Sequence, residues 1–161
     1  DWASYCKAHS AILPKLVVEI TEEEEMNEQE LERKRNVPGG TGVFALDDYG
    51  SGYSNGNSLL TVAPKYVKVD IAIIRGIDTD ADKQQFLMTL IDYAHPRGVQ
   101  VLAEGVETLS ELRKVLEMGV DLLQGYCLAR PAAEPGAIDE KAAEVIAEVE
   151  RQKAEREEAG S

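Results

Sequence analysis

Short apolar runs alternate along the chain with longer segments whose apolar residues recur at helical spacing. The runs have the length of buried strands and end at polar residues or glycine-containing turns. Strands are predicted at residues 16–20, 43–46, 66–70, 99–103 and 121–126. Helices are predicted at 2–13, 22–35, 58–60, 82–95, 108–118 and from 139 onward. This alternation predicts an α/β fold with a parallel sheet.

Three local patterns make these elements more specific. Thr108 with Glu111 three residues later is a capping-box signal for the helix 108–118. In the strand 66–70, alternation places Lys68 opposite to Val67 and Val69. The helix from 139 onward is charged and has an apolar stripe, which consists of Ala142, Val145, Ile146 and Val149.

Polar residues stand at or near the end of each predicted strand. They are Glu19, Asp47, Lys68, Glu104 and Gln124. In a (β/α) barrel the carboxyl ends of the strands build the active site. The five predicted strands therefore favour a site at the strand ends, as a (β/α) barrel would have.

Two adjacent carboxylates, Asp47 and Asp48, follow the apolar run 43–46. Where a strand ends and the backbone turns, neighbouring side chains can both reach ions over its tip. Two hard cations about 3.5–4 Å apart form an arrangement that cleaves phosphodiesters. Taken alone, Asp-Asp-Tyr-Gly is more typical of a polar turn. The polar residues at the other strand ends favour the site.

Composition limits the classes of partner. The chain has 161 residues, of which 43% are hydrophobic, and this is enough for a core. It contains 17 Lys and Arg residues and 30 Asp and Glu residues, so its net charge is -13. This balance argues against binding a nucleic-acid polymer, which requires basic surface. It leaves room for a small anionic ligand, because bound divalent cations reverse the local charge.

Five motifs together resemble the C-terminal part of the EAL domain family. They are Glu19-Ile20-Thr21-Glu22, Leu-Asp-Asp-Tyr-Gly-Ser-Gly-Tyr-Ser at 46–54, Lys68-Val69-Asp70, Ala-Glu-Gly-Val-Glu-Thr at 103–108, and Gln124-Gly125-Tyr126. The resemblance runs from about Leu16 to Pro131. The family consists of metal-dependent phosphodiesterases that linearise the bacterial second messenger cyclic di-GMP on a TIM-like barrel. The resemblance therefore implies the C-terminal portion of such a hydrolase, with linear pGpG as product. It implies an α/β fold that is a partial TIM-like (β/α) barrel, with about five parallel strands, flanking helices and a C-terminal charged helix.

The resemblance also implies a role for each matching residue. Glu19, Asp47 and Asp48 would bind two ions, Mg or Mn, with Asp47 bridging them. Lys68 would contact the attacking water or the scissile phosphate, and Glu104 would bind or deprotonate that water. Taken alone, Lys68 is more typical of a strand-end salt bridge.

Further positions would support this site. Glu107 resembles the residue that anchors the loop over the metal site. In the family, this loop takes part in dimer contacts. That loop is Gly50, Ser51, Gly52, Tyr53 and Ser54. Gln124 and Asp70 would hold site water or the second shell of ligands. On their own, Glu107 is more typical of a first helical turn and Gln124 of a buried amide.

The sequence also departs from the family pattern. The family has a Glu-Ala-Leu motif and a metal-binding Asn, both expected upstream of Trp2, and neither is present in this sequence. About half of the strands of a full barrel are also missing. Ile71 stands where the family often has Arg. We therefore expect weak metal binding and an inactive isolated chain. A non-catalytic cyclic di-GMP receptor or an oligomerisation module derived from the EAL fold is the alternative.

The expected organisation follows from these observations. Residues 1–135 would form the C-terminal part of an EAL-type barrel domain, and 136–161 a charged C-terminal helical extension. The expected partners are cyclic di-GMP, further copies of the chain, and an upstream sensory or cyclase domain in a longer parent protein. The expected location is the bacterial cytoplasm, with any membrane attachment in regions outside this sequence.

Overall fold

The computed structural model describes residues 2–21, 28–36, 42–51, 57–134 and 136–160. These residues fall into two compact units, Asp1–Lys68 and Val69–Ser161. The fold is α/β, and the strand order is β1-β2-β3-β4-β5. Strands that are consecutive in the sequence therefore lie side by side in the sheet, which confirms the predicted fold class.

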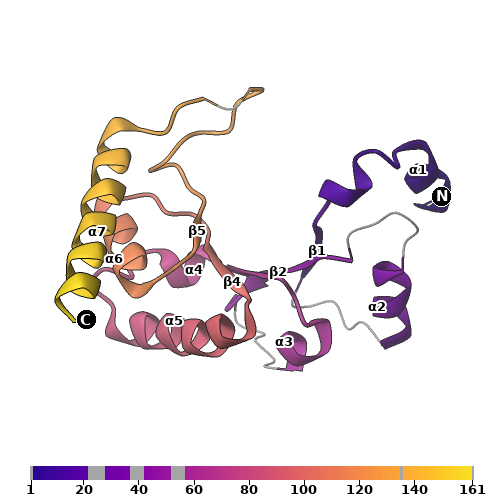
Figure 1. Cartoon of the computed structure of the whole chain (residues 1–161), viewed down its shortest axis with the longest axis horizontal. Helices are drawn as coiled ribbons and strands as arrows, with labels where there is room; N and C mark the ends of the chain where they lie inside the picture. The colour runs from indigo at the N-terminus through magenta and orange to yellow at the C-terminus, as the bar shows by residue number, and fades with distance from the viewer. Residues whose placement is uncertain (1, 22–27, 37–41, 52–56, 135, 161) are drawn as a thin grey trace. The chain divides into compact units, whose positions relative to one another are not determined.

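The first unit contains three strands with short helices between them (Figure 1). Its elements are α1 (Trp2–Ala8), the 3₁₀ turn η1 (Leu13–Lys15), β1 (Val18–Thr21), α2 (Glu28–Arg35), β2 (Phe44–Tyr49), α3 (Asn57–Val62) and β3 (Tyr66–Val69), whose last residue opens the second unit. β1 and β2 are parallel, with Ile20 opposite Leu46 and Thr21 opposite Asp47. This register sets the last residue of β1 beside Asp47, and β2 continues to Tyr49.

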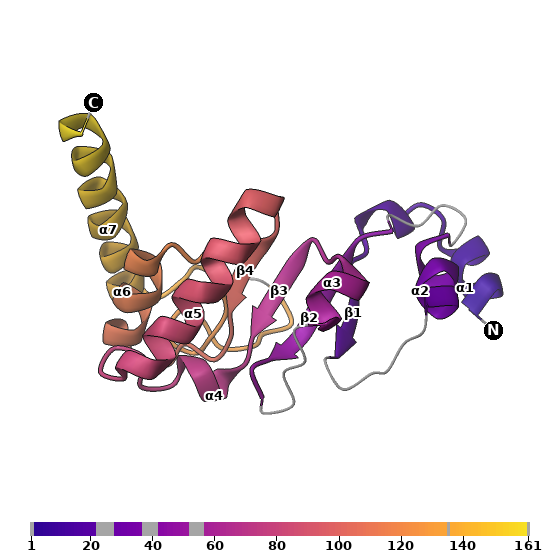
Figure 2. The same cartoon turned by 90° about the horizontal axis from the view of Figure 1, so that it is seen from below.

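Packing in the first unit centres on β2, whose first three residues, Phe44, Ala45 and Leu46, are buried. Figure 2 shows α3 beside β2, and the two elements are in contact. The Arg35 guanidinium donates a hydrogen bond to the Val62 carbonyl oxygen and lies 5.5 Å from the centre of the Phe44 ring. A single side chain therefore joins α2, β2 and α3.

The second unit contains the remaining strands and the longer helices. Its elements are α4 (Ile71–Ile74), α5 (Ala81–Ala94), the 3₁₀ turn η2 (His95–Arg97), β4 (Gln100–Ala103), α6 (Leu109–Met118), β5 (Leu122–Leu123) and α7 (Glu140–Ala159). β4 and β5 are parallel, with Leu102 opposite Leu122. Apolar residues from α5, α6 and β4 form its core, including Leu87, Leu112, Val115, Val101 and Ala103.

Helix α7 begins at the N-cap Asp139, as the sequence predicted, and lies along α6 (Figure 1). Ala142 and Val149, two turns apart on the predicted apolar stripe, are buried. The Arg113 guanidinium donates to Glu148 at 2.6 Å, and this bond holds the pKa of Glu148 below its ordinary value. The charged C-terminal helix is therefore packed against α6 within the second unit.

Several predicted elements differ from the structure. The predicted helix 2–13 ends at Ala8, and the turn η1 follows at Leu13–Lys15. The strand predicted at 43–46 continues to Tyr49, so Asp47 and Asp48 lie within β2. The predicted strand 121–126 is reduced to Leu122–Leu123, because the chain turns at Gly125, whose carbonyl accepts from the Leu128 and Ala129 amides. A Cβ on Gly125 would overlap the backbone nitrogen and carbonyl oxygen of Val106. The predicted strand 66–70 ends one residue early, because Asp70 caps the unpredicted helix α4 by accepting from the Ala72 amide at 2.7 Å.

The predicted helix 108–118 is confirmed with its capping box, and its Glu111 does more than cap. Glu111 is only 4% exposed, and among the residues that the structure describes it is the one charged residue that is buried. One carboxylate oxygen accepts from the Gly76 amide at 2.8 Å, and the other accepts from the Glu107 and Thr108 amides, each at 3.0 Å. Burial acts to raise the pKa of Glu111, but these amide donors together lower it.

Across the described part of the chain, none of the helices combines the length and apolar character needed to cross a membrane.

The close approach of Gly125 to Val106 predicts a large cost for any side chain at residue 125. Gly125→Ala should destabilise the protein by about 3 kcal/mol, because the added methyl meets backbone that cannot rotate away. Gly136→Ala is the matched control, since its Cβ would have open space around it. Urea denaturation followed by circular dichroism measures both changes. Equal stabilities of the two variants would contradict the packing described for Gly125.

The amide donors around Glu111 predict a pH-dependent contribution to stability. Its pKa is below the ordinary value of 4.5 in the folded state. The contribution is therefore complete above about pH 4.5 and is lost as the pH falls through the folded pKa. At neutral pH, Glu111→Gln should cost about 1–3 kcal/mol, because an amide cannot accept from all three N–H groups.

Urea denaturation at a series of pH values from neutral to about 3 tests this contribution. The stability difference between the wild type and Glu111→Gln should shrink on acidification. Glu117→Gln, on the same helix with a 39% exposed side chain, should show little difference at any pH. A difference for Glu111→Gln that stays constant with pH would contradict the charged, hydrogen-bonded carboxylate.

Candidate functional site

In the first unit, an ammonium group lies between two carboxylates at the carboxyl ends of the strands. Lys68 Nζ lies 2.7 Å from Asp47 Oδ1 and 3.0 Å from Glu19 Oε1. The side chains of Lys68 and Asp47 are only 12% and 18% exposed, whereas that of Glu19 is 56% exposed. The structure therefore brings together three of the predicted site residues, one from each of β1, β2 and β3.

The alternation of side chains on the strands produces this arrangement. On β3 the flanking residues Val67 and Val69 are fully buried on one face, so Lys68 extends from the other, as the sequence predicted. On β1 the buried Ile20 likewise leaves Glu19 on the opposite face. The strand-end salt bridge that the sequence also suggested for Lys68 is thus present, and its partners are the two predicted metal ligands.

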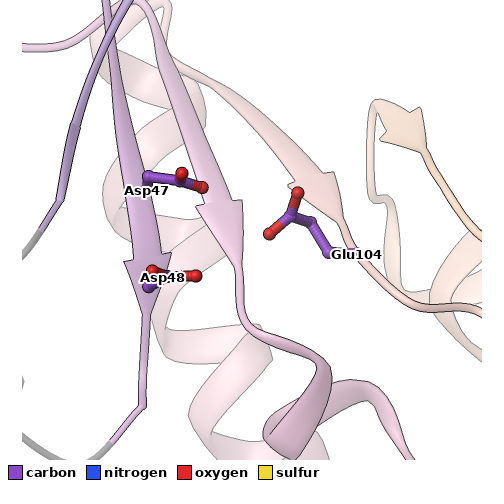
Figure 3. A group of neighbouring side chains, drawn as sticks. All are labelled: Asp47, Asp48 and Glu104. Carbon is purple, nitrogen blue, oxygen red and sulfur yellow. The ribbon is translucent and has the colours of Figure 1, made fainter.

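Asp48 follows Asp47 on β2 but breaks the alternation. Its φ is +55°, in the left-handed region that side-chain-bearing residues seldom adopt. Figure 3 shows the Asp47 and Asp48 side chains extending toward the same side of β2. The Ser51 amide then donates to the Asp48 carbonyl at 3.2 Å, closing a turn. The backbone conformation at Asp48 thus allows two neighbouring carboxylates to share one side of the strand.

The donors of this group suit a hard cation. Glu19, Asp47 and Asp48 offer carboxylate oxygens, which Mg²⁺, Mn²⁺ and Ca²⁺ prefer. The Lys68 ammonium shows that a positive charge is accommodated within hydrogen-bonding distance of two of these carboxylates. The first unit therefore has the chemistry to bind a divalent cation at its strand ends.

In the second unit, Glu104 follows the last residue of β4 (Figure 3) and is half-buried. Its amide donates to the Val69 carbonyl at 3.1 Å, which fixes the backbone at the strand end. The next residue, Gly105, has φ +66°, and the Ile71 side chain occupies the space that a Cβ would need. Glu104 is therefore presented by a short, tightly packed turn.

A cavity of about 450 Å³ lies next to this turn in the second unit. Its lining residues come from α4, the Gly105 turn and the segment after β5, and they are Ile71, Gly105, Glu107, Gln124, Gly125, Tyr126, Ala129, Arg130 and Pro131. The Arg130 guanidinium lies 5.1 Å from the centre of the Tyr126 ring. An exposed aromatic face with amide, carboxylate and guanidinium groups around it suits a planar polar ligand.

The supporting residues predicted from the sequence lie in several places. Glu107 and Gln124 both line this cavity, and Glu107 accepts from the Arg75 guanidinium at 2.6 Å. Asp70 caps α4. Of the predicted loop, Gly50 and Ser51 form the turn after β2, whereas Gly52, Tyr53 and Ser54 lie outside the described residues.

Several residues of this region were not identified from the sequence. The sequence patterns indicate no role for Arg75 or Arg130, and they mark Ile71 only as a departure from the family pattern. Arg75 lies one helical turn after Ile71, so the pattern of α4 would have placed both on one face. The helix itself was missed because Ile71–Ile74 is only one turn long and consists of apolar residues that also suit a strand.

Comparison with known proteins supports an assignment to a family. The sequence model of the family described as EAL domain matches residues 2–131. The chain is 32% identical over 118 residues to the probable cyclic di-GMP phosphodiesterase PdeG of Escherichia coli K12. It is 34% identical over 117 residues to the probable cyclic di-GMP phosphodiesterase PdeN of the same organism. Each match covers 72% of this chain but only 23% of the relative's length.

Solved structures of EAL proteins have the same fold. A standalone EAL protein from Vibrio cholerae O395, in a c-di-GMP bound form, superposes with a TM-score of 0.72 at 29% identity, over 87% of this chain and 60% of that one. Klebsiella pneumoniae BlrP1, in a calcium and cyclic di-GMP complex, superposes with a TM-score of 0.74 at 30% identity, over 85% of this chain and 36% of that one. With the family match over residues 2–131, these similarities show that the chain belongs to the EAL domain family.

Proposed function

We propose that this chain is the C-terminal portion of a metal-dependent cyclic di-GMP phosphodiesterase that opens the cyclic dinucleotide to linear pGpG. The observation that carries the proposal is the placement of Glu19 and Asp47 around the Lys68 ammonium at the strand ends of the first unit. Membership of the EAL family and the cyclic di-GMP complexes of its structural relatives support the choice of substrate.

Glu19, Asp47 and Asp48 would hold divalent cations, Mg²⁺ or Mn²⁺, through carboxylate oxygens. When bound, the cations would polarise the phosphoryl group and lower the pKa of a water molecule. Glu104 would accept the proton of the attacking water, and the Lys68 ammonium would face the negative charge on the phosphate. The water oxygen would bond to phosphorus as one P–O bond of the ring breaks. The departing ribose oxygen would take up a proton and become a hydroxyl, and a terminal phosphate would remain on the other end of the linear product.

The cavity of the second unit would bind part of the ligand away from the phosphorus. A guanine base is planar and carries hydrogen-bonding groups along its edges. Tyr126 offers a face for stacking, and Gln124 and Glu107 offer an amide and a carboxylate. The proposed division is therefore cation chemistry at the strand ends of the first unit and base binding in the second.

The isolated chain is expected to bind cations weakly and to show little turnover. Two ligands that the family resemblance implies, the Glu of Glu-Ala-Leu and an Asn, are not in this sequence. A hard cation with few protein oxygens keeps most of its water and is loosely held. Metal-dependent turnover by this chain at rates typical of enzymes, about 1 per second or more, would contradict this expectation.

Cation binding tests the assignment of the carboxylates directly. Asp47→Asn should weaken Mn²⁺ binding by about tenfold or more, because the substitution removes a charged ligand. Asp92→Asn is the matched control on the exposed face of α5, and it should change the affinity less than about twofold, because salt screens an exposed surface charge. Isothermal titration calorimetry with Mn²⁺ measures both, with circular dichroism to verify folding. Equal affinity of Asp47→Asn and the wild type would overturn the metal assignment.

Binding of the dinucleotide tests the substrate. Cyclic di-GMP is titrated into the chain with Ca²⁺ in place of Mg²⁺ or Mn²⁺, to hold back hydrolysis. We expect binding that depends on the cation. Binding of equal strength without any divalent cation would favour a non-catalytic receptor, and complete absence of binding would contradict the proposed substrate for this chain.

A further inference from the structure

Glu111 is buried without taking part in the proposed chemistry. It lies at the start of α6, and its side chain is not among the residues that line the cavity. A buried carboxylate destabilises the folded state unless several hydrogen-bond donors face its oxygens. Here one oxygen accepts from the Gly76 amide, which follows α4, and the other from the Glu107 and Thr108 amides, which follow β4. Glu111 therefore joins the loop at Gly76 to the loop at Glu107 and Thr108.

Both of these loops lead to the wall of the cavity. Ile71, at the start of α4, packs against Gly105. The side chain of Arg75, next to Gly76, donates to the side chain of Glu107 at 2.6 Å. This ion pair is largely exposed, with side chains 60% and 42% exposed, so solvent screens it and it holds the loops only weakly. The three amide bonds to the buried carboxylate are the stronger connection.

The backbone carries the constraint further, to the opposite wall. Val106 precedes Glu107, and its amide donates to the Gln124 carbonyl at 3.0 Å. Its own carbonyl accepts from the Cys127 amide at 3.0 Å. Gly125 and Tyr126 lie between these two bonds, with Gly125 against the Val106 backbone. Any shift of residues 106–107 would therefore move the segment that presents Tyr126.

We propose that Glu111 is a positioning residue for the ligand cavity of the second unit, holding residues 105–107 against the Gln124–Cys127 segment. The proposal deepens the proposed function, because the cavity is the one assigned to the base of the dinucleotide. Glu111 touches no ligand and acts through the backbone of Glu107 and Val106. Its loss should therefore loosen the cavity before it unfolds the unit.

Amide hydrogen exchange measured by NMR separates positioning from general stability. In Glu111→Gln the amides of Val106, Glu107 and Cys127 should exchange about tenfold faster relative to the Leu90 amide in α5. Val149→Ala is the control for a general loss of stability, because it removes buried methyl groups between α7 and α6, away from the cavity lining. It should leave that ratio unchanged. Equal acceleration of all these amides in Glu111→Gln would overturn the proposal.

Ligand binding gives a second readout. With Ca²⁺ present, Glu111→Gln should raise the dissociation constant for cyclic di-GMP about tenfold while leaving the Mn²⁺ affinity unchanged. Glu117→Gln, on the same helix, should change neither. Unchanged dinucleotide affinity in Glu111→Gln would contradict a positioning role. If the wild type binds no dinucleotide, the proposed substrate fails, whereas the exchange pattern still decides whether Glu111 organises the cavity.

Discussion

Parallel pairing of strands is the constraint on which the candidate site depends. Parallel strands place their carboxyl ends at the same edge, so residues at the ends of sequential strands become neighbours without being close in sequence. In the first unit, β1 and β2 pair with Ile20 opposite Leu46, which sets Glu19 and Asp47 near Lys68 of β3. A shift of one residue would turn Glu19 toward the buried face. Burial of Ile20 and Leu46 therefore fixes the position of the charged group.

Electrostatics inside so acidic a chain requires local compensation. With a net charge of -13, further carboxylates can be placed together only where a cation or several N–H donors face them. Lys68 supplies the cation for Glu19 and Asp47, whereas three amides supply the donors for Glu111. The first solution depends on a side chain, because the ammonium sits on a flexible stem. The second is fixed in the backbone and suits a structural role.

Sequence patterns predicted the elements whose periodicity is set locally. The helix at α5, the capping box at Thr108 and the alternation around Lys68 are all confirmed. The failures occur where tertiary contacts override local preference. Residues 124–126 look like a strand, but the approach of Gly125 to Val106 turns the chain. The second role of Glu111 could not be predicted, since its bond to Gly76 joins residues 35 apart, and only the fold brings them together.

The two parts of the candidate site are held in physically different ways. The carboxylates around Lys68 are held by the register of paired strands, whose hydrogen-bonded ladders resist small displacements. The cavity walls are loops, joined by a few bonds through Glu111 and Val106, so they can move without breaking a strand pair. The group around Lys68 is therefore the more rigid arrangement, and the cavity of the second unit is the more adaptable one. Substitutions should therefore separate along this line, with strand-end changes acting on cation binding and changes around Glu111 acting on the ligand.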